Sequence, residues 1–310
     1  MINKEDIHLE QHASNPVICP TFGNPVIADP TFLPPDQTPD GKWHLFAHSL
    51  FGIHHYVSDN GIHWNMLSGL VSKLSVRPYI YKENDIYYLF YEKVDSIRRF
   101  PFYDSHMEFM RSSDLIHWEK PIPVILPSLS WHKTKNKVGN IGNPFLVKTD
   151  KGYKLFYSAG LYFMRDCKFC EPRYFGCAYS EKIEGPYTLA SDPIYEVEGK
   201  NFIIAHKSVK YLDVYIGMQT RFYFTGILSH CYIGIVFSRD GVIWENVEEL
   251  GIWPEEGWRS SHVYAGDLKF YEDKIYFYYN ARNGRMPWSK EHVGLAIITV
   301  SPKNSVTSVL

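Results

Sequence analysis

The sequence predicts an all-β protein built from repeated antiparallel units, and three observations support this prediction. Short runs rich in β-branched and aromatic residues alternate with Gly, Asp and Asn turns, which is typical of strands joined by hairpins. No segment shows the spacing of an amphipathic helix. A short phrase that ends in tryptophan recurs at residues 58–64, 113–118 and 238–244, which indicates that one structural unit is repeated.

The spacing of this phrase indicates the kind of repeat. Trp64 and Trp118 are 54 positions apart, a degenerate copy closes at Tyr187, and Trp244 follows 57 positions later. Periods above about 40 residues that consist of strands are typical of propeller blades. We therefore expect a five-bladed β-propeller of four-stranded antiparallel blades. A large β-sandwich is the alternative, which the even recurrence disfavours.

Each unit consists of an inner strand, a hairpin, an aromatic second strand, a loop, a third strand and a closing strand. Arg77 and Leu89 are 12 positions apart, as are Asn143 and Leu155, so the second and third units align. We therefore treat residues 1–310 as a single propeller domain. The expected blades span roughly residues 24–70, 71–125, 138–196, 200–250 and 257–302.

Composition excludes several classes of partner. The 32 basic and 34 acidic residues leave a net charge of −2, so no bulk positive field is available for nucleic acid. No run approaches the roughly 20 apolar residues of a membrane helix. The first residues lack the apolar stretch of a secretory signal and the five cysteines are an odd number, so we expect a cytoplasmic protein. The oligomeric state is left open.

Several strand and turn motifs carry a resemblance to a known superfamily. They are Ala28-Asp29-Pro30, the second strands at residues 43–46 and 88–91, and the Ser-Asp turns. On these motifs the sequence resembles the five-bladed propeller proteins that include the family 43 glycoside hydrolases and related furanosidases, over about residues 20–300. The resemblance implies glycoside hydrolysis by carboxylates near the propeller axis. It places Asp29 as the base, whereas Asn143 and His206 stand where further carboxylates are expected.

Propeller geometry predicts which side chains face the central channel, because the inner strand begins at the channel mouth and the second strand returns there. Every expected end of a second strand is polar, and a concave polar pocket is the default ligand site. Ordinary polar strand ends are the alternative. Candidates on the inner strands are Asp29, Arg77, Asn143 and His206, with His262 or Asp267 in the fifth blade. Candidates on the second strands are His48, Glu92, Ser158, Gln219 and Asn280.

Glycosyl transfer requires two carboxylates, one to protonate the leaving oxygen and one to activate water or attack carbon. Asp29 is the candidate base or nucleophile. Glu92 is the preferred acid, followed by Glu171, with Glu108 as a third option. The alternative for Glu92 is a salt bridge to Arg77, which would make it a poor acid. For Glu171 the alternative is a solvated loop carboxylate.

Arginines are frequent on the predicted rim loops. Guanidinium groups bind carboxylates and phosphates bidentately, so an anionic sugar, such as a uronate or a phosphorylated glycan, is one option for the ligand. Solvated loop charges are the alternative. The arginines concerned are Arg77, Arg98, Arg99, Arg165, Arg173, Arg221, Arg259, Arg282 and Arg285.

Metal and cofactor chemistry has little support in the sequence. Cys167, Cys170, Cys177 and His132 could form a zinc site, but a second Cys-x-x-Cys pair is missing, so we expect free thiols and no metal. The resemblance makes His262 similar to an axial histidine that helps to hold a metal or water, so a structural ion near the axis is retained as an option. No nucleotide-binding fingerprint is present, and we expect no cofactor.

These observations predict a glycoside hydrolase-like enzyme that cleaves a polar glycan at the channel mouth, with a carbohydrate or glycoconjugate as its substrate. The first alternative is a non-hydrolytic propeller that binds carbohydrate or works in polysaccharide assembly, which Asn143 and His206 favour. The second alternative is a propeller that binds proteins, which would need no convergent polar pocket.

Overall fold

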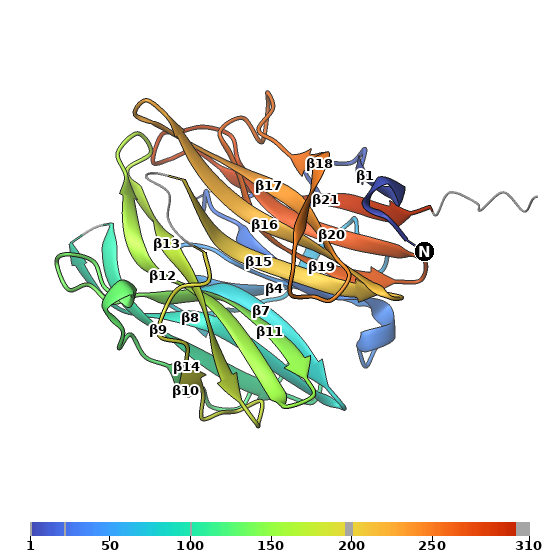
Figure 1. Ribbon diagram of the computed structural model, residues 1–310, viewed down its shortest axis with the longest axis horizontal. Coiled ribbons are helices and arrows are strands. Elements are labelled where there is room, and N and C mark those ends of the chain that lie inside the picture. Colours follow the sequence, from blue (N-terminus) through green and yellow to red (C-terminus); the bar gives the residue numbers. More distant parts are fainter. Residues whose placement is uncertain (1, 22, 100, 196–200, 302–310) are drawn as a thin grey trace, which may run out of the picture.

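The chain folds almost entirely into strands. The computed structural model describes residues 2–21, 23–99, 101–195 and 201–301 (Figure 1). The only helical segments in these ranges are three-residue 3-10 turns, η1 (Lys4–Asp6), η2 (Pro35–Gln37) and η3 (Ser130–His132). None of them is long enough to cross a membrane. The prediction of an all-β protein is therefore confirmed.

The first three sheets are antiparallel and follow one another along the chain. The first sheet comprises β2 (Ala28–Leu33), β3 (Trp43–His48), β4 (Gly52–Ser58), β5 (Asn65–Met66) and β6 (Ser72–Lys73). The second comprises β7 (Ser75–Glu83), β8 (Ile86–Arg99), β9 (Phe102–Ser112) and β10 (Ile122–Ile125). The third comprises β11 (Ile141–Thr149), β12 (Gly152–Met164), β13 (Phe169–Ser180) and β14 (Thr188–Leu189).

The remaining strands form one eight-stranded sheet with two antiparallel halves. The first half contains β15 (Phe202–Tyr211), β16 (Val214–Thr225), β17 (Leu228–Ser238) and β18 (Glu245–Ile252). The second half contains β19 (His262–Tyr271), β20 (Lys274–Arg282), β21 (Glu291–Val300) and β1 (Ile7–Gln11). A single parallel bridge between Cys231 and His262 joins the halves. Hydrogen bonding alone thus gives four sheets, and the count of five blades stays a prediction.

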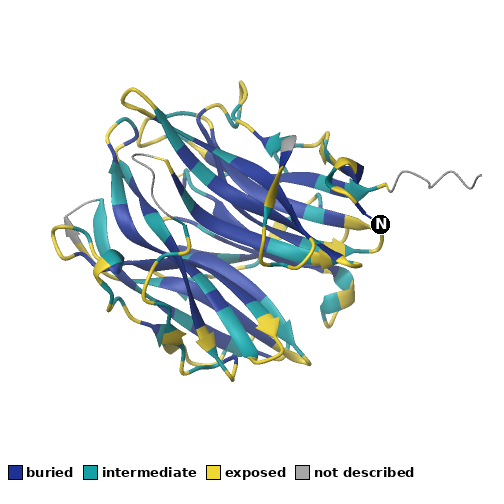
Figure 2. Cartoon of the chain, viewed as in Figure 1, coloured by how far each residue is buried: buried dark blue, intermediate teal, exposed yellow. Residues whose placement is uncertain are grey.

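The strands are buried over much of their length (Figure 2), and clusters of buried apolar side chains join neighbouring sheets. Phe32 of the first sheet meets Tyr278 of β20 edge to face, with ring centroids 4.7 Å apart. Phe145 of the third sheet meets Tyr79 of the second in the same way at 5.5 Å. Large flat side chains contribute much apolar area and pack in such offset arrangements, which accounts for the aromatic excess of the sequence.

The recurring phrase in the sequence is a hydrogen-bonded turn. In its second copy, Oδ1 of Asp114 accepts the backbone N–H groups of Ile116 and His117, and the Ser112 hydroxyl accepts that of Leu115. Asp240 accepts two backbone N–H groups in the same way in the last copy. A short acceptor side chain that satisfies two consecutive donors stabilises such a turn, so the phrase recurs where third strands end.

The N-terminal strand closes the last sheet. β1 pairs antiparallel with β21, with Ile7 opposite Val300, so that the two ends of the described chain lie in one sheet (Figure 1). Ile7 belongs to the apolar cluster around Ile298, whereas its neighbour His8 is exposed.

We predict that Ile7→Ala lowers the free energy of unfolding by about 2–5 kcal/mol, because it removes a buried branched side chain from this contact. His8→Ala, one position away on the exposed face, should change it by less than about 0.5 kcal/mol. Urea denaturation measures both values. Equal effects of the two substitutions would contradict the closing role of β1.

Candidate active site

The inner strands share an unusual backbone conformation where they begin. Asp29 of β2, Arg77 of β7, Asn143 of β11 and Ala265 of β19 have φ values of 50°, 53°, 50° and 46°. Each lies at a break in the pairing register with the second strand of its sheet. Left-handed backbone at a residue other than glycine costs energy and concentrates at ligand sites. A β-bulge also redirects a side chain. These four equivalent positions are therefore candidates for contact with a ligand.

These strand starts converge on a narrow central cavity. Asp29, Arg77, Asn143 and Ala265 all line it, together with Lys207 of β15. Its volume is about 10 Å³, which is close to the minimum for one water molecule. The inner strands therefore approach one another closely at this cavity, and its polar lining residues are almost fully buried.

Arg77 links two other candidate residues, Glu92 and Glu171. Its Nη1 donates to Oε2 of Glu92 at 2.6 Å and to the hydroxyl of Tyr103 at 2.8 Å. Its Nη2 donates to Oε2 of Glu171 at 3.0 Å. Since Glu92 lies on β8 and Glu171 on β13, one buried guanidinium joins the second and third sheets.

Glu92 is fully buried and accepts several hydrogen bonds. Besides the Arg77 bond to Oε2, its Oε1 accepts from the hydroxyl of Ser105 at 2.7 Å and from Nδ2 of Asn140 at 2.5 Å. A Cβ atom on Gly142 would lie 2.1 Å from Oε2, so only glycine fits there. These contacts hold the Glu92 side chain against the guanidinium, so Glu92 anchors Arg77. The salt bridge considered for Glu92 from the sequence is present.

Glu171 has the opposite electrostatic character. Burial raises its pKa to about 7, although the Arg77 guanidinium lowers it, and the carboxylates of Asp29 and Glu291 raise it further. Its side chain is almost buried at the mouth. A carboxyl group with this pKa is partly protonated at neutral pH, which suits a general acid.

Asp29 lies against a neutral histidine. Its Oδ2 is 3.2 Å from Nδ1 of His48, and its backbone N–H donates to Oδ1 of Asn280 at 3.1 Å. Burial raises the pKa of Asp29, while Arg77 and Lys207 lower it. Burial also lowers the pKa of His48 to about 3. At neutral pH the contact between Asp29 and His48 is therefore not an ion pair, and Nδ1 of His48 accepts the backbone N–H of Arg77 at 3.3 Å.

Sequence reasoning missed Glu291 and Lys207. Glu291 is the first residue of β21, accepts from Nη1 of Arg282 at 3.3 Å, and has its pKa raised by burial. Glu171 likewise lies near the start of the third strand of its sheet. A carboxylate at the same position in two repeats was therefore the sequence signal that could have identified Glu291. Burial lowers the pKa of Lys207, which lies beside His206 in sequence, and Asp29 opposes this shift.

Three other predicted residues lie near the mouth or below it. Nδ2 of Asn143 donates to the hydroxyl of Ser158 at 2.8 Å, so the third sheet contributes an amide paired with a hydroxyl. Asp267 lies farther along its strand, where Oδ2 accepts from the hydroxyl of Thr31 at 2.7 Å and pairs with Lys269 at 3.3 Å. Asp267 therefore joins β19 to β2 and is almost fully buried.

His206, Gln219 and His262 lie away from the central cavity. Nε2 of Gln219 lies 3.3 Å from Nδ1 of His206, and both residues line a groove on the other side of β15. Adjacent residues of a strand point to opposite faces, so the choice of His206 was one residue away from the cavity-lining Lys207. His262 is buried beside the hydroxyl of Ser229, 3.0 Å from Nε2.

Within the described ranges, no group of three or more His, Cys, Asp or Glu side chains is arranged to hold a metal ion. Cys167, Cys170 and Cys177 are buried free thiols. His132 instead has Nε2 3.1 Å from the hydroxyl of Tyr157. The zinc alternative thus gains no support from this part of the chain.

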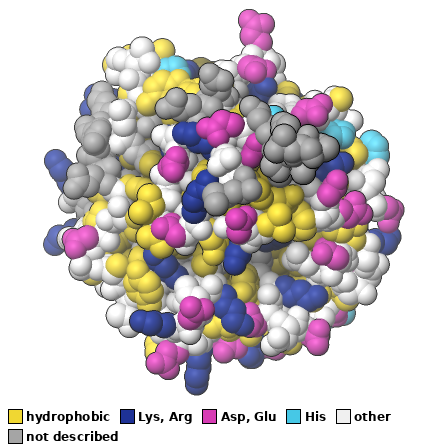
Figure 3. All heavy atoms as spheres, turned by 45° about the vertical axis from the view of Figure 1, so that its right-hand side comes forward, with side chains coloured by type: hydrophobic (Ala, Val, Ile, Leu, Met, Phe, Trp, Pro, Cys, Tyr) yellow, Lys and Arg dark blue, Asp and Glu magenta, His cyan; other side chains and the backbone are white. Residues whose placement is uncertain are grey.

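Several rim arginines are neutralised by carboxylates of the same chain. Arg282 pairs with Glu291 and Arg285 with Asp166. Acidic and basic side chains are also interspersed on the face shown in Figure 3. The side chains of Arg98 and Arg99 lie outside the described residues. These pairings weaken the case for an anionic ligand at the mouth itself.

Comparisons with known proteins identify the fold. No family model and no curated protein matches the sequence. A family-43 glycoside hydrolase described as thermostable matches with a TM-score of 0.59 at 14% identity, over 89% of this chain and 90% of that one. The N-acetylgalactosamine deacetylase of F. plautii, solved with blood group B trisaccharide, matches with a TM-score of 0.66 at 12% identity, over 94% and 95%.

A family 117 glycoside hydrolase from the marine bacterium Zobellia galactanivorans matches with a TM-score of 0.56 at 11% identity, over 96% of this chain and 91% of that one. The chain therefore shares the β-propeller fold of these proteins, as the sequence predicted. At these identities the similarity concerns the fold.

We predict that Glu92→Gln lowers the free energy of unfolding by about 3–5 kcal/mol, because it leaves the buried Arg77 charge with less compensation. Glu119→Gln is the matched control, since Glu119 pairs with Arg111 in solvent and should cost at most about 1 kcal/mol. Chemical denaturation compares the two variants. A small loss for Glu92→Gln would contradict its anchoring role.

The raised pKa of Glu171 also predicts a pH dependence of stability. Its ordinary value is 4.5 and its folded value about 7, so the folded protein retains a proton that the unfolded chain loses in this range. This carboxyl group therefore lowers stability as pH rises from about 4.5 to about 7. Each unit of pKa is worth about 1.4 kcal/mol, so the loss reaches on the order of 3 kcal/mol.

Denaturation curves across that range should show a shallower pH dependence for Glu171→Gln than for the wild type. Glu181→Gln, at an exposed position, should leave the dependence unchanged. Identical slopes for all three proteins would contradict the raised pKa of Glu171.

Proposed function

We propose that the protein is a glycoside hydrolase that acts at the mouth of a five-bladed propeller. In this proposal β15–β18 form the fourth blade, and β19–β21 with β1 form the fifth. The observation that carries it is the electrostatic coupling of Glu171 and Asp29 at the mouth, where Glu171 has a pKa of about 7 and contacts Arg77. The propeller fold shared with glycoside hydrolases supports it.

Each carboxyl group has a distinct task in the proposed mechanism. Glu171, protonated in part at neutral pH, donates its proton to the oxygen of the leaving group as the glycosidic bond breaks. The ionised form of Asp29 accepts a proton from the water that attacks the anomeric carbon. His48 and Asn280 hold Asp29 in place through the contacts described above.

Glu92, the acid preferred from the sequence, supports the site in this proposal without donating a proton. Its carboxylate is buried and accepts bonds from Arg77, Ser105 and Asn140. Arg77 in turn orients Glu171. Glu291 raises the pKa of Glu171 and so provides the tuning charge that the amide of Asn143 cannot supply. The mechanism as proposed uses no cofactor, and cytoplasmic location stays a prediction.

A non-hydrolytic propeller that binds carbohydrate or works in polysaccharide assembly is the second candidate. The specific observation in its favour is Asn143, an amide at an inner-strand position equivalent to Asp29. Carbohydrate binding requires no carboxylate at this position. Measured turnover of a glycoside therefore distinguishes the binding propeller from the hydrolase.

We predict that Asp29→Asn and Glu171→Gln each lower kcat/KM on aryl glycosides by about 10²–10⁴-fold, the range for loss of a general acid or base. Asp36→Asn and Glu181→Gln, both exposed, should retain the wild-type rate. A panel of 4-nitrophenyl glycosides measures these rates. Absence of turnover by the wild type, with sugar binding retained, would instead favour the binding propeller.

The roles of Glu171 and Asp29 can be distinguished by varying the leaving group of the substrate and the pH. Because a 2,4-dinitrophenolate leaves without protonation, the loss caused by Glu171→Gln should shrink with this substrate, whereas the loss caused by Asp29→Asn should persist. Wild-type activity on substrates that need protonation should fall above pH about 7, as Glu171 loses its proton. A rate that rises steadily through pH 8 would exclude Glu171 as the acid.

A further inference from the structure

The third sheet and the β15–β18 half of the last sheet enclose a groove between them. Two adjoining cavities make up this groove, with volumes of about 670 Å³ and about 820 Å³. Both are lined by Tyr195, Ile203, Arg221 and Asn246, so they are continuous. We call this hollow the β15 groove. It is far larger than the central cavity, and each of its two cavities has a volume in the usual range of ligand sites.

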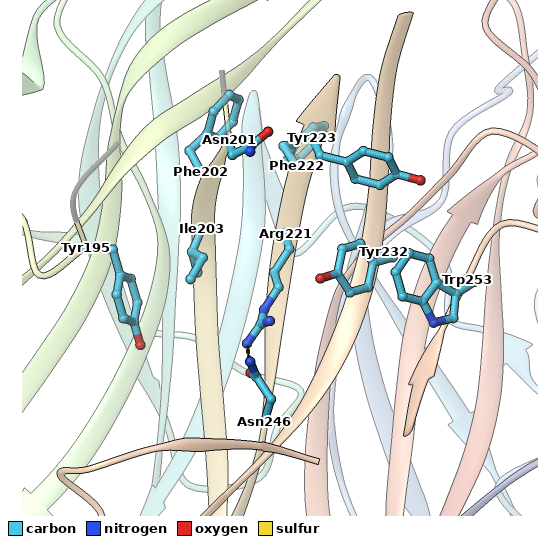
Figure 4. Close-up of a pocket in the computed structure, with 10 residues that line it drawn as sticks. All are labelled: Tyr195, Asn201, Phe202, Ile203, Arg221, Phe222, Tyr223, Tyr232, Asn246 and Trp253. Carbon is cyan, nitrogen blue, oxygen red and sulfur yellow. Dashed lines mark hydrogen bonds between the residues drawn. The ribbon is translucent and has the colours of Figure 1, made fainter. Parts of the chain in front are cut away.

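A row of side chains across three strands forms one wall of the groove (Figure 4). Ile203 is opposite Arg221, and Arg221 is opposite Tyr232. Tyr232 stacks on Trp253 with ring centroids 3.8 Å apart and planes 7° apart. Trp253 is 47% exposed, so part of its indole remains available to a ligand.

Glycine accounts for the space along this wall. The Arg221 side chain passes over Gly234, where an added Cβ would lie 3.3 Å from Nε. Gly234 is opposite Gly251 in the neighbouring strand, and a Cβ on Gly251 would lie 3.1 Å from Nε1 of Trp253. Two paired glycines therefore leave room for an arginine and an indole to lie flat against the sheet.

Arg221 differs from the arginines at the mouth in its partners. Its Nε donates to Oε1 of Gln219 at 3.1 Å, and its Nη2 donates to the side-chain oxygens of Gln219 and Asn246. These acceptors are neutral amides, and within the described part of the chain its Nη1 donates no hydrogen bond. The guanidinium charge is thus oriented by amides and left without a carboxylate there.

A second cation lies in the same groove. Lys154 lines it, with Nζ 4.6 Å from the centroid of the Phe156 ring. The pKa of His206 is lowered to about 3, mainly by burial and further by the charges of Arg221 and Lys154. Both cations therefore lie close enough to influence the same imidazole. The β15 groove therefore combines the cations Arg221 and Lys154 with aromatic surface, and Asp150 and Asp240 line the same cavity.

We propose that the β15 groove is a second glycan site, separate from the channel mouth, which binds a sugar that carries a carboxylate. The carboxylate of a uronic acid would accept hydrogen bonds from Nη1 of Arg221, because guanidinium forks match carboxylates. The apolar face of a sugar ring would pack on the exposed indole of Trp253, as aromatic rings present broad apolar surfaces with little loss of conformational entropy. This binding requires no hydrolysis, so it stands independently of the proposed catalytic function.

The test is calorimetric titration of the full-length protein with trigalacturonate and, at the same ionic strength, with neutral xylotriose. The wild type should bind trigalacturonate at least tenfold more tightly than xylotriose. Arg221→Ala and Trp253→Ala should each weaken trigalacturonate binding tenfold or more. Equal affinities for the two sugars, or unchanged affinity in Arg221→Ala, would overturn the proposal.

Further variants separate this site from the mouth and from misfolding. Arg239→Ala removes an exposed arginine of the same sheet half and should bind like the wild type. Asp29→Asn should also leave trigalacturonate binding unchanged. Loss of binding in Asp29→Asn with retention in Arg221→Ala would place the ligand at the mouth and overturn the proposal. Melting temperatures within about 2 °C of the wild type would show that the groove variants are folded.

Discussion

The buried guanidinium of Arg77 is the interaction on which the channel mouth depends. It joins β7 to Glu92 of β8 and to Glu171 of β13, so one charge links two sheets and both candidate acids. A buried ion is stable only when its partners are themselves held by further bonds. Ser105 and Asn140 meet this requirement for Glu92. Glu171 shares the same cation, but burial and two nearby carboxylates outweigh the attraction and raise its pKa to about 7, so it is partly protonated at neutral pH.

Backbone strain accompanies this cluster. Asp29, Arg77 and Asn143 adopt left-handed φ values immediately before a proline, and each lies at the start of an inner strand. Such conformations persist only where surrounding structure compensates their energy. Here the compensation comes from aromatic packing between the sheets and from side-chain bonds at the mouth. The fold thus brings side chains from separate units to one axis, at a local cost in backbone energy.

The sequence predicted the repeated architecture well and the site in part. Local hydrogen bonding makes the turn around Asp114 recognisable in a linear sequence, and Asp29, Arg77 and Asn143, chosen as equivalent strand starts, line one cavity. The placement failed at His206, because β15 has the apolar Ile204 and Ala205 at its register break, and the polar residue that returns to the axis is Lys207. Glu291 and Glu171 are 120 positions apart, and their equivalent places near the starts of third strands were the one sequence signal that connects them.

The sequence by itself determined the all-β repeat, the turns that end its third strands and the polar residues at the starts of its inner strands, because these depend on neighbours within a few positions. Only the tertiary structure decided that Glu92 anchors Arg77 while Glu171 can hold a proton near neutral pH. It also decided that a hollow lies beside Arg221, where Gly234 leaves room for the side chain. Burial and electrostatic coupling arise between segments far apart in the chain, so linear spacing does not determine them.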